Sequence, residues 1–424
     1  MNPETLAMLR EQPLDWRARS APAANTTIEE FVKSRPSLFE AGLLPPVLAM
    51  RESAVRHNVA EMAGYCARNG VSLAPHGKTH MSPQLSARQL AAGGWGVTVA
   101  NASQARVYRA FGVPRVFCAN ELADTASIGW VSAALDADPD FTFVCYVDSV
   151  PGVRLLGRTL ADVGARRPID VVVELGYAGG RTGCRDLASV TAVAGEVSRT
   201  PGLRLVGVSG FEGGFGHGDV PGPAESTQVH EFLRGLRAAG SAVAGIAESG
   251  TPFYVSAGGS AFFDLVVDDL VGDWYLGREA TVLLRSGCYL IHDAGYYRRQ
   301  TPFARSVPGS LRASLRLWGA VLSRPEPTLA LVGVGRRDAA FDIDLPMPEV
   351  IRRVDGTMSE AGGLTVTGLD DQHGYLRLPA GIALSVGDWV GFGLSHPCTA
   401  LDKWRMLMMV DDDDRIVDCV RTFF

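Results

Sequence analysis

Lys78, in the loop formed by residues 75–80, is the clearest candidate for a reactive side chain in the sequence. It follows a short apolar run, residues 71–74, that is typical of a buried strand. Partial desolvation at the end of such a strand lowers the pKa of a lysine and frees its amine as a nucleophile. An amine of this kind can hold an aldehyde cofactor as a Schiff base. Because most lysines are solvated, a catalytic interpretation of Lys78 needs support from other residues.

Two later loops could complete such a site. The first, residues 174–183, is rich in glycine, so its backbone can approach a ligand and present Arg181. The second contains four small residues: Ser256, Gly258, Gly259 and Ser260. Free backbone N–H groups in a loop of this kind can bind a phosphate, although ordinary tight turns have the same composition. With Lys78, the two loops predict a pocket for pyridoxal phosphate, with the aldehyde at one end and the phosphate at the other.

A third candidate site lies near the C-terminus, where His396 and Cys398 are two residues apart. In an extended chain their side chains lie on the same face, and imidazole and thiolate are both good Zn²⁺ ligands. Two ligands leave room for water or substrate, as in catalytic zinc sites. The spacing by itself favours a turn with an incidental buried cysteine.

Two other features have simpler interpretations, and a third is a further candidate for the site. The acidic run 411–414 lies between two apolar segments and is expected to be the solvated tip of a hairpin, not a metal site. The seven cysteines include no CxxC pair, which indicates reduced thiols that mostly fill the core. His217, in a glycine-rich loop, is a further candidate for the pocket lining.

These loops can form one site only if the fold brings them to the same edge of a sheet. The sequence has a pattern that predicts such a fold. Eight apolar segments alternate with mostly helical ones: residues 71–74, 95–100, 115–118, 141–147, 169–175, 203–209, 253–256 and 280–284. Strands that are apolar on both faces are typical of a parallel sheet, and eight of them favour an α/β fold with a (β/α)8 barrel over a doubly wound open sheet. The helix after the seventh segment has the weakest pattern.

The domain organisation follows from changes along the chain. Residues 1–45 form an N-terminal extension, residues 46–286 the barrel, and residues 287–424 a mostly β domain in which short β-like runs alternate with turns and prolines. A net charge of −6 gives no reason to expect nucleic-acid or membrane binding. Without a signal peptide's apolar centre in residues 1–20, we expect a cytoplasmic protein.

Residues 75–80, 174–183 and 395–405 resemble the fold-type III pyridoxal-phosphate enzymes, in the branch of D-serine dehydratase, D-threonine aldolase and the related amino acid deaminases. The resemblance implies an alanine racemase-like barrel with a C-terminal β domain, usually paired as a homodimer. Residues 46–51 would then pair with the β domain. The chain departs from the family pattern beside the lysine, at Gly77 and Met81.

The resemblance also implies a role for each site residue. Lys78 would form the Schiff base, with His76 in the same loop also binding the cofactor, and Arg181 would contact its phenolic oxygen. The phosphate would be held by Ser256, Gly258, Gly259 and Ser260. His396 and Cys398 would bind zinc, with manganese as the alternative metal.

The expected reaction is β-elimination from a D-β-hydroxy amino acid such as D-serine or D-threonine, giving a 2-oxo acid and ammonia. Lys78 would take the Cα proton as general base, and the metal would polarise the departing hydroxyl. The alternatives are a D-threonine aldolase-type lyase, an amino acid racemase and a non-catalytic pyridoxal-phosphate carrier. A carrier would have no use for His396 and Cys398.

Overall fold

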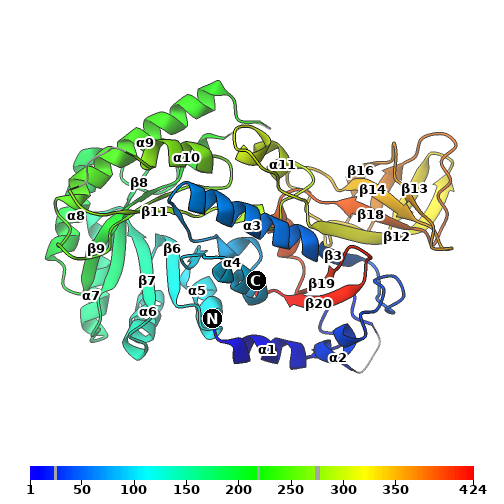
Figure 1. Cartoon of the computed structure of the whole chain (residues 1–424), viewed down its shortest axis with the longest axis horizontal. Coiled ribbons are helices and arrows are strands. Elements are labelled where there is room, and N and C mark those ends of the chain that lie inside the picture. Colours follow the sequence, from blue (N-terminus) through cyan, green and yellow to red (C-terminus); the bar gives the residue numbers. More distant parts are fainter. Residues whose placement is uncertain (23–25, 217–219, 273–276) are drawn as a thin grey trace.

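The computed structural model describes residues 1–22, 26–216, 220–272 and 277–424 (Figure 1). The predicted architecture is confirmed, because an eight-stranded parallel sheet is followed by an antiparallel β domain. The two lie at opposite ends of the long axis of the molecule in Figure 1. In the described part of the chain, no helix combines the length and the apolar character needed to cross a membrane.

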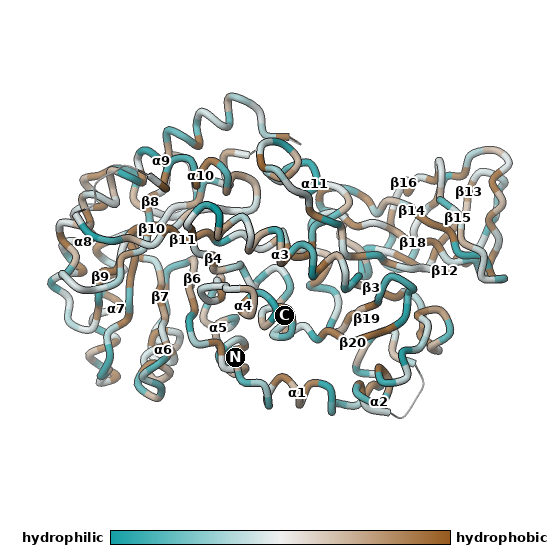
Figure 2. Tube along the Cα trace, in the orientation of Figure 1, coloured by the Kyte–Doolittle hydropathy of each residue, from teal (hydrophilic) through white to brown (hydrophobic). Residues whose placement is uncertain are grey.

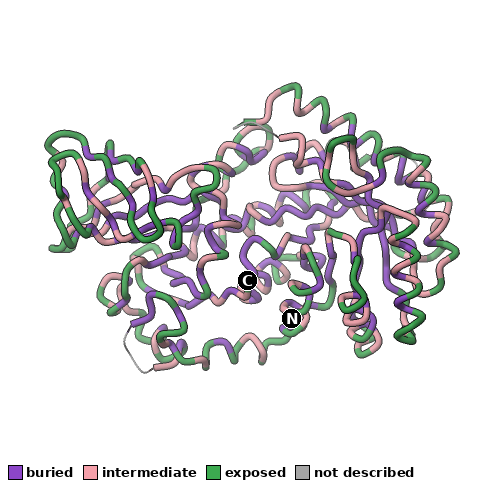
Figure 3. Tube along the Cα trace, turned by 180° about the vertical axis from the view of Figure 1, so that it is seen from behind, coloured by how far each residue is buried: buried purple, intermediate pink, exposed green. Residues whose placement is uncertain are grey.

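The eight parallel strands form the barrel in sequence order. They are β4 (Ser72–Leu73), β5 (Val97–Val99), β6 (Arg115–Glu121), β7 (Thr142–Val147), β8 (Ile169–Leu175), β9 (Leu203–Gly210), β10 (Tyr254–Ala257) and β11 (Thr281–Leu284). β4 pairs with β11, and a bridge between His76 and Thr98 joins the end of β4 to β5, so the sheet closes. Every strand overlaps the segment predicted for it. Figure 2 shows hydrophobic stretches along the strands, and Figure 3 shows the strands buried beneath helices with exposed outer faces.

Helices cover the barrel and begin where the loops of interest end. They are α3 (Glu52–Arg68), α4 (Pro83–Ala91), α5 (Ala102–Ala110), α6 (Thr125–Ala137), α7 (Val150–Asp162), α8 (Leu187–Arg199), α9 (Pro223–Ala244) and α10 (Phe263–Leu270). Five of them start at a side chain that accepts a backbone N–H: Ser82, Asn101, Asp124, Ser149 and Asp186. α10, which follows the seventh strand, has only eight residues, and this explains its weak sequence pattern.

The β domain contains ten strands from two parts of the chain. They are β3 (Val47–Arg51), β12 (Leu315–Glu326), β13 (Leu329–Val332), β14 (Met347–Arg352), β15 (Met358–Glu360), β16 (Thr365–Leu369), β17 (Gly374–Arg377), β18 (Trp389–Gly393), β19 (Met406–Val410) and β20 (Ile416–Arg421). β3 pairs with β12 and β19. β14 and β15 were not among the predicted runs, because β14 is mostly half-buried and contains Pro348, and β15 is short and largely exposed.

Residues 411–414 form the tip of the β19–β20 hairpin, as expected. The Asp411 carboxylate accepts the backbone N–H groups of Asp413 and Arg415. Two arginines pair with the run: Arg35 pairs with Asp411 and Arg51 with Asp414. The acidic cluster is therefore structural.

The N-terminal extension runs between the barrel and the β domain (Figure 1). It contains α1 (Pro3–Glu11), the short strands β1 (Pro13–Leu14) and β2 (Thr26–Thr27), and α2 (Ile28–Lys33). The backbone N–H of Asn2 binds the carbonyl of Phe111 at the end of α5, and Arg19 pairs with Asp338 of the β domain. The extension therefore contacts both domains.

Candidate active site

The lysine loop follows β4 as a short 3-10 turn, η1 (Gly77–Thr79). Tyr108 of α5 is fully buried beneath it and donates a hydrogen bond from its hydroxyl to the Gly77 carbonyl, at 2.8 Å. A Cβ at position 77 would lie 2.5 Å from the Tyr108 hydroxyl and 2.6 Å from two ring carbons. The tyrosine thus occupies the space that a larger residue at position 77 would need, which explains this departure from the family pattern.

Met81, the other departure, closes the lysine loop. Its backbone has a φ of +43°, and its carbonyl accepts the N–H of Phe423 at 2.9 Å. The Phe423 ring lies 5.4 Å from that of Phe111. The lysine loop is therefore held by α5 on one side and by residues that follow β20 on another.

A cavity of about 140 Å³ lies at the carboxyl ends of the barrel strands, beside Lys78. Its lining comes from loops after six of the strands and from two strand ends: His76, Lys78, Ala100, Ala119, Asn120, Tyr146, Arg181, Phe211, Gly259 and Arg285. Four predicted site residues, Lys78, His76, Arg181 and Gly259, are therefore brought together. Lys78 itself is exposed, so the expectation of a desolvated lysine is wrong for the protein alone.

Arg285, directly after β11, is the charged group that the sequence interpretation missed. It is buried, and its guanidinium donates to the Ser209 hydroxyl at 3.1 Å, to the Gly210 carbonyl at 2.7 Å and to the Ser256 hydroxyl. A single arginine at the end of an apolar strand was the only signal available. It places a fixed positive charge in the cavity wall.

His76 is uncharged at neutral pH. Burial, and then the charges of Lys78 and Arg285, hold the pKa of the imidazole well below its usual range. Its Nδ1 atom is buried and has no hydrogen-bond partner in the protein. An unpartnered buried nitrogen in a cavity wall is typical of a position that meets a ligand.

The predicted phosphate loop already binds a carboxyl group of the chain. The N–H groups of Gly258 and Gly259 donate to the two carboxylate oxygens of Glu212, at 3.1 and 2.5 Å. Ser256 lies inside β10, where its hydroxyl donates to the Leu283 carbonyl and accepts from Arg285. Of the four predicted residues, Ser256 thus forms hydrogen bonds within the barrel, and Gly258 and Gly259 donate to Glu212. The sequence interpretation did not identify Glu212.

Arg181 lies in the predicted glycine-rich loop after β8. Its guanidinium is 4.8 Å from the centre of the Phe211 ring, on the wall of the cavity. Arg185 fixes the loop by donating to the carbonyls of residues 180, 181, 182 and 183. Arg185 therefore holds the loop in shape, and Arg181 faces the cavity.

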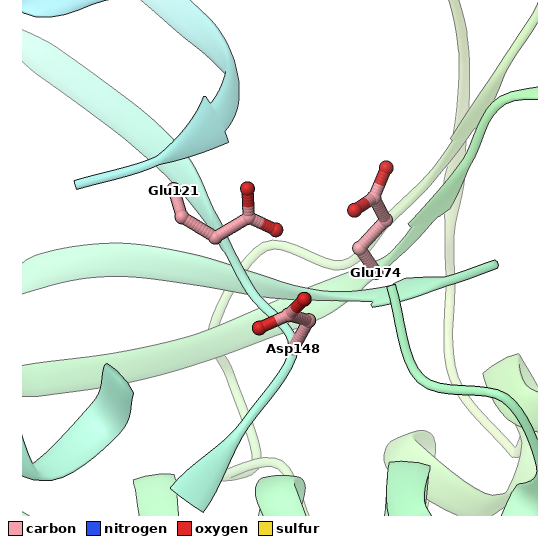
Figure 4. Close-up of side chains that lie close together, drawn as sticks. All are labelled: Glu121, Asp148 and Glu174. Carbon is pink, nitrogen blue, oxygen red and sulfur yellow. The ribbon is translucent and has the colours of Figure 1, made fainter. Parts of the chain in front are cut away.

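Three carboxylates meet at the ends of β6, β7 and β8 (Figure 4). The side chains are those of Glu121, Asp148 and Glu174, and each offers an oxygen within 4.8 Å of the other two. Burial, and then the charge of Glu174, raise the pKa of Glu121 to about 8. Asp148 accepts the backbone N–H of Gly183 at 3.1 Å, which links the trio to the Arg181 loop. The sequence interpretation did not identify this cluster.

The His-Cys motif lies at the start of α12 (Pro397–Leu401). The His396 ring lies 2.5 Å through Nδ1 from the Asp342 carboxylate, and Thr399 donates to the other oxygen of Asp342 at 2.8 Å. A histidine held in this way through one nitrogen keeps the other free for a metal, which is the usual arrangement of zinc-binding histidines. The Cys398 thiol and then Asp342 raise the pKa of His396 to about 9.

The motif contacts the lysine loop of the same chain. The Cys398 sulfur lies 3.5 Å from the Thr79 hydroxyl, one residue after Lys78, and 3.9 Å from the sulfur of Cys288. The backbone N–H of Cys288 in turn binds the hydroxyl of Ser260 at 3.4 Å. The lysine loop, the predicted phosphate loop and the His-Cys motif are therefore neighbours. His217, the remaining candidate, lies outside the described residues.

The chain is similar to known proteins over most of its length. A family model described as "Putative serine dehydratase domain" matches residues 314–410. A D-threonine aldolase from Arthrobacter sp is 26% identical over 340 residues, which is 79% of this chain and 80% of that protein.

Solved structures share the whole architecture. The D-threonine aldolase from Filomicrobium marinum has a TM-score of 0.75 at 22% identity, covering 90% of this chain and 95% of that one. The D-threo-3-hydroxyaspartate dehydratase from Delftia sp. HT23 has a TM-score of 0.72 at 20% identity, covering 90% and 98%. The fold is thus alanine racemase-like, and the resemblance inferred from the sequence is confirmed.

Proposed function

Since the chain has an alanine racemase-like fold and is related to a D-threonine aldolase, we propose that it is a pyridoxal-phosphate- and zinc-dependent lyase. Its reaction would be the elimination of water from a D-β-hydroxy amino acid, followed by hydrolysis of the resulting enamine to a 2-oxo acid and ammonia. The observation that carries this proposal is the 3.5 Å contact between the Cys398 thiol and Thr79, because it joins the metal-binding motif to the loop of Lys78.

The residues present fit the cofactor. The cavity beside Lys78 contains two arginines, Arg181 and Arg285, and an unpartnered buried nitrogen on His76. The cofactor carries a negatively charged phosphate and a phenolic oxygen on its pyridine ring, which are groups that such a lining binds. The Lys78 amine would hold the aldehyde, Arg181 the phenolic oxygen, and the loop of Gly258, Gly259 and Ser260 would lie next to the phosphate.

The residues present also fit a soft metal. His396 offers a nitrogen oriented by Asp342, and Cys398 offers a thiol beside it. Burial opposes the thiolate, but hydrogen bonds from Cys288 and then His396 hold the pKa of Cys398 well below its usual range, so the sulfur is available as a ligand. This donor set favours zinc, with manganese as the alternative.

The chain itself would bind, orient and move protons. When bound, pyridoxal phosphate supplies an electron sink for charge at Cα and zinc supplies a Lewis acid for the β-hydroxyl. Lys78, exposed at the cavity rim, is placed to remove the Cα proton as general base. His76 is uncharged beside it, so the imidazole adds no further positive charge to the cavity.

A retro-aldol lyase is the second candidate. The similarity to D-threonine aldolases from two sources favours it. The same lysine, cavity and metal motif would serve it, but the proton removed would be that of the β-hydroxyl, and the products would be glycine and an aldehyde. The products therefore decide between the two reactions.

The test is a screen of D- and L-serine, threonine and 3-hydroxyaspartate with separate detection of 2-oxo acid, ammonia, glycine and aldehyde. We expect 2-oxo acid and ammonia in equal amounts from D-isomers. Lys78→Ala should lose both the visible absorbance of the cofactor and the activity, and His396→Ala should lose activity alone. Lys33→Ala, an exposed lysine on α2, is the matched control. Glycine as the product would replace the dehydratase with the aldolase, and no turnover with bound cofactor would refute both.

A further inference from the structure

Cys288 lies beside the His-Cys motif, although it is 110 residues away in sequence. Its sulfur is 3.9 Å from that of Cys398. Two thiolates that bind one zinc ion, each about 2.3 Å from the metal in tetrahedral geometry, are about 3.8 Å apart. The two cysteines therefore have the separation that a shared zinc ion requires.

We propose that Cys288 is the third protein ligand of the zinc ion bound by His396 and Cys398. The inference rests on the metal-binding part of the proposed function and adds a residue that the sequence motif does not contain. A site with one histidine and two cysteines leaves a fourth position open for water or a substrate oxygen, as in catalytic zinc sites. Two thiolates also select zinc over manganese, because manganese prefers oxygen ligands.

The exposure of the cysteines supports this assignment. Five of the seven, Cys66, Cys118, Cys145, Cys184 and Cys419, are buried as core-filling residues. Cys288 and Cys398 are the two that are partly exposed, and they are close to each other. A thiol kept at a partly open position, beside a second thiol and an imidazole, has surroundings suited to a ligand.

The backbone around Cys288 is tied to that around His396. The buried Asp293 carboxylate accepts the N–H of His396 at 2.9 Å and those of Gly295 and Tyr297 at 3.0 Å. The carbonyl of Cys288 accepts the N–H of His292, immediately before Asp293. The two segments that would bind the ion are therefore fixed relative to each other before any metal is present.

The imidazole lies farther from at least one of the two sulfurs than they lie from each other. Among the described residues, the ligand atoms of His396, Cys288 and Cys398 do not all lie within 4.8 Å of one another, whereas the two sulfurs are 3.9 Å apart. Binding of the ion would therefore bring the His396 ring closer to the two thiols.

The experiment is zinc K-edge X-ray absorption of the purified, cofactor-loaded protein, which counts Zn–S distances near about 2.3 Å separately from shorter Zn–N and Zn–O distances. We expect two sulfur ligands in the wild type and one in Cys288→Ser and in Cys398→Ser. Cys288→Asp should keep the metal with one sulfur, because a carboxylate replaces the thiolate. Cys419→Ala, which removes a buried thiol from β20, should still show two. In a chelator competition, Cys288→Ser should bind zinc at least about tenfold more weakly.

Each outcome has a distinct meaning. One Zn–S distance in the wild type, lost in Cys398→Ser and unchanged in Cys288→Ser, would overturn the inference and leave the proposed function standing. Absence of bound zinc from the active wild type would overturn both the inference and the metal-dependent part of the function. A thiol titration that finds two fewer free thiols in the metal-free wild type than the seven in the chain would indicate a disulfide and would also count against the inference. The cofactor's visible absorbance serves as the folding check for each variant.

Discussion

Replacing Gly77 by alanine should displace the lysine loop. The backbone at Gly77 does not have a positive φ, so alanine causes no conformational strain there. The added methyl would instead meet Tyr108, whose hydroxyl and two ring carbons lie 2.5 to 2.6 Å from the Cβ position. Ordinary contacts begin near 3.4 Å, so the atoms must separate by close to an ångström. Tyr108 is fully buried, and the exposed side of the contact is the loop that carries Lys78.

Overpacking of this kind costs about 1 to 3 kcal/mol. A loss of about 2 kcal/mol lowers the folded-to-unfolded ratio roughly 30-fold. We expect urea unfolding followed by tryptophan fluorescence to show this loss, with an unchanged slope. The visible absorbance of the lysine-bound cofactor should decrease as well, because the amine moves with the loop.

Two comparisons make this test specific. Gly362→Ala adds the same methyl where no atom lies within 4 Å, and it should leave stability unchanged or slightly higher. Tyr108→Leu should recover about 1 to 2 kcal/mol of the Gly77→Ala loss in the double variant, whereas Tyr108→Phe keeps the ring carbons and should recover little. If Gly77→Ala unfolds together with the wild type, or if the losses in Gly77→Ala and Tyr108→Leu simply add, the explanation of the glycine is wrong.

Three further predictions address the cavity and the metal. The pKa of Glu121 in the folded protein is about 8, which is above the unfolded value of about 4.3. The stability that this carboxyl group contributes is therefore complete at low pH and is lost as the pH rises through about 8. The urea concentration at the midpoint of unfolding should fall between pH 5 and pH 9 (roughly the span of the two values), and it should fall less in Glu121→Gln. Arg285→Lys keeps the charge but loses the forked contacts to Ser209, Ser256 and Gly210, so equilibrium dialysis should show pyridoxal phosphate bound about tenfold more weakly. Chelation of the metal should abolish product formation and leave the visible absorbance intact, and re-addition of zinc should restore the activity; a bleached protein would contradict separate metal and cofactor sites.

The barrel could be predicted from the sequence because most of its strands are buried on both faces for most of their length. β8 is buried along its whole length, and its apolar run is interrupted only by Asp170 and Glu174. The loops of the site could then be placed by position, since each follows the carboxyl end of a strand. β14 lacked this signal because a half-buried strand with a proline resembles a loop.

The residues that were missed act across long distances in sequence. Cys288 is 110 residues from Cys398, and Glu212 is 46 residues from Gly258. No local spacing reveals such contacts. Glu121 ends β6 and Asp148 follows β7, and a carboxylate at such a position is ordinarily solvated, so only the closed barrel shows that they meet.

The hydrogen bond between the Phe423 N–H and the Met81 carbonyl has a consequence for enzyme engineering. Gln84, at the start of α4, also exchanges hydrogen bonds with the backbone of Cys419 and Arg421 in β20. Lys78, the proposed Schiff-base lysine, is thus positioned partly by the other domain. A chimera that joins this barrel to a β domain from a relative would carry Lys78 without these contacts, unless residues 419–423 were transplanted with the barrel. The domain boundary that is natural for folding is therefore not the boundary at which the proposed active site can be exchanged.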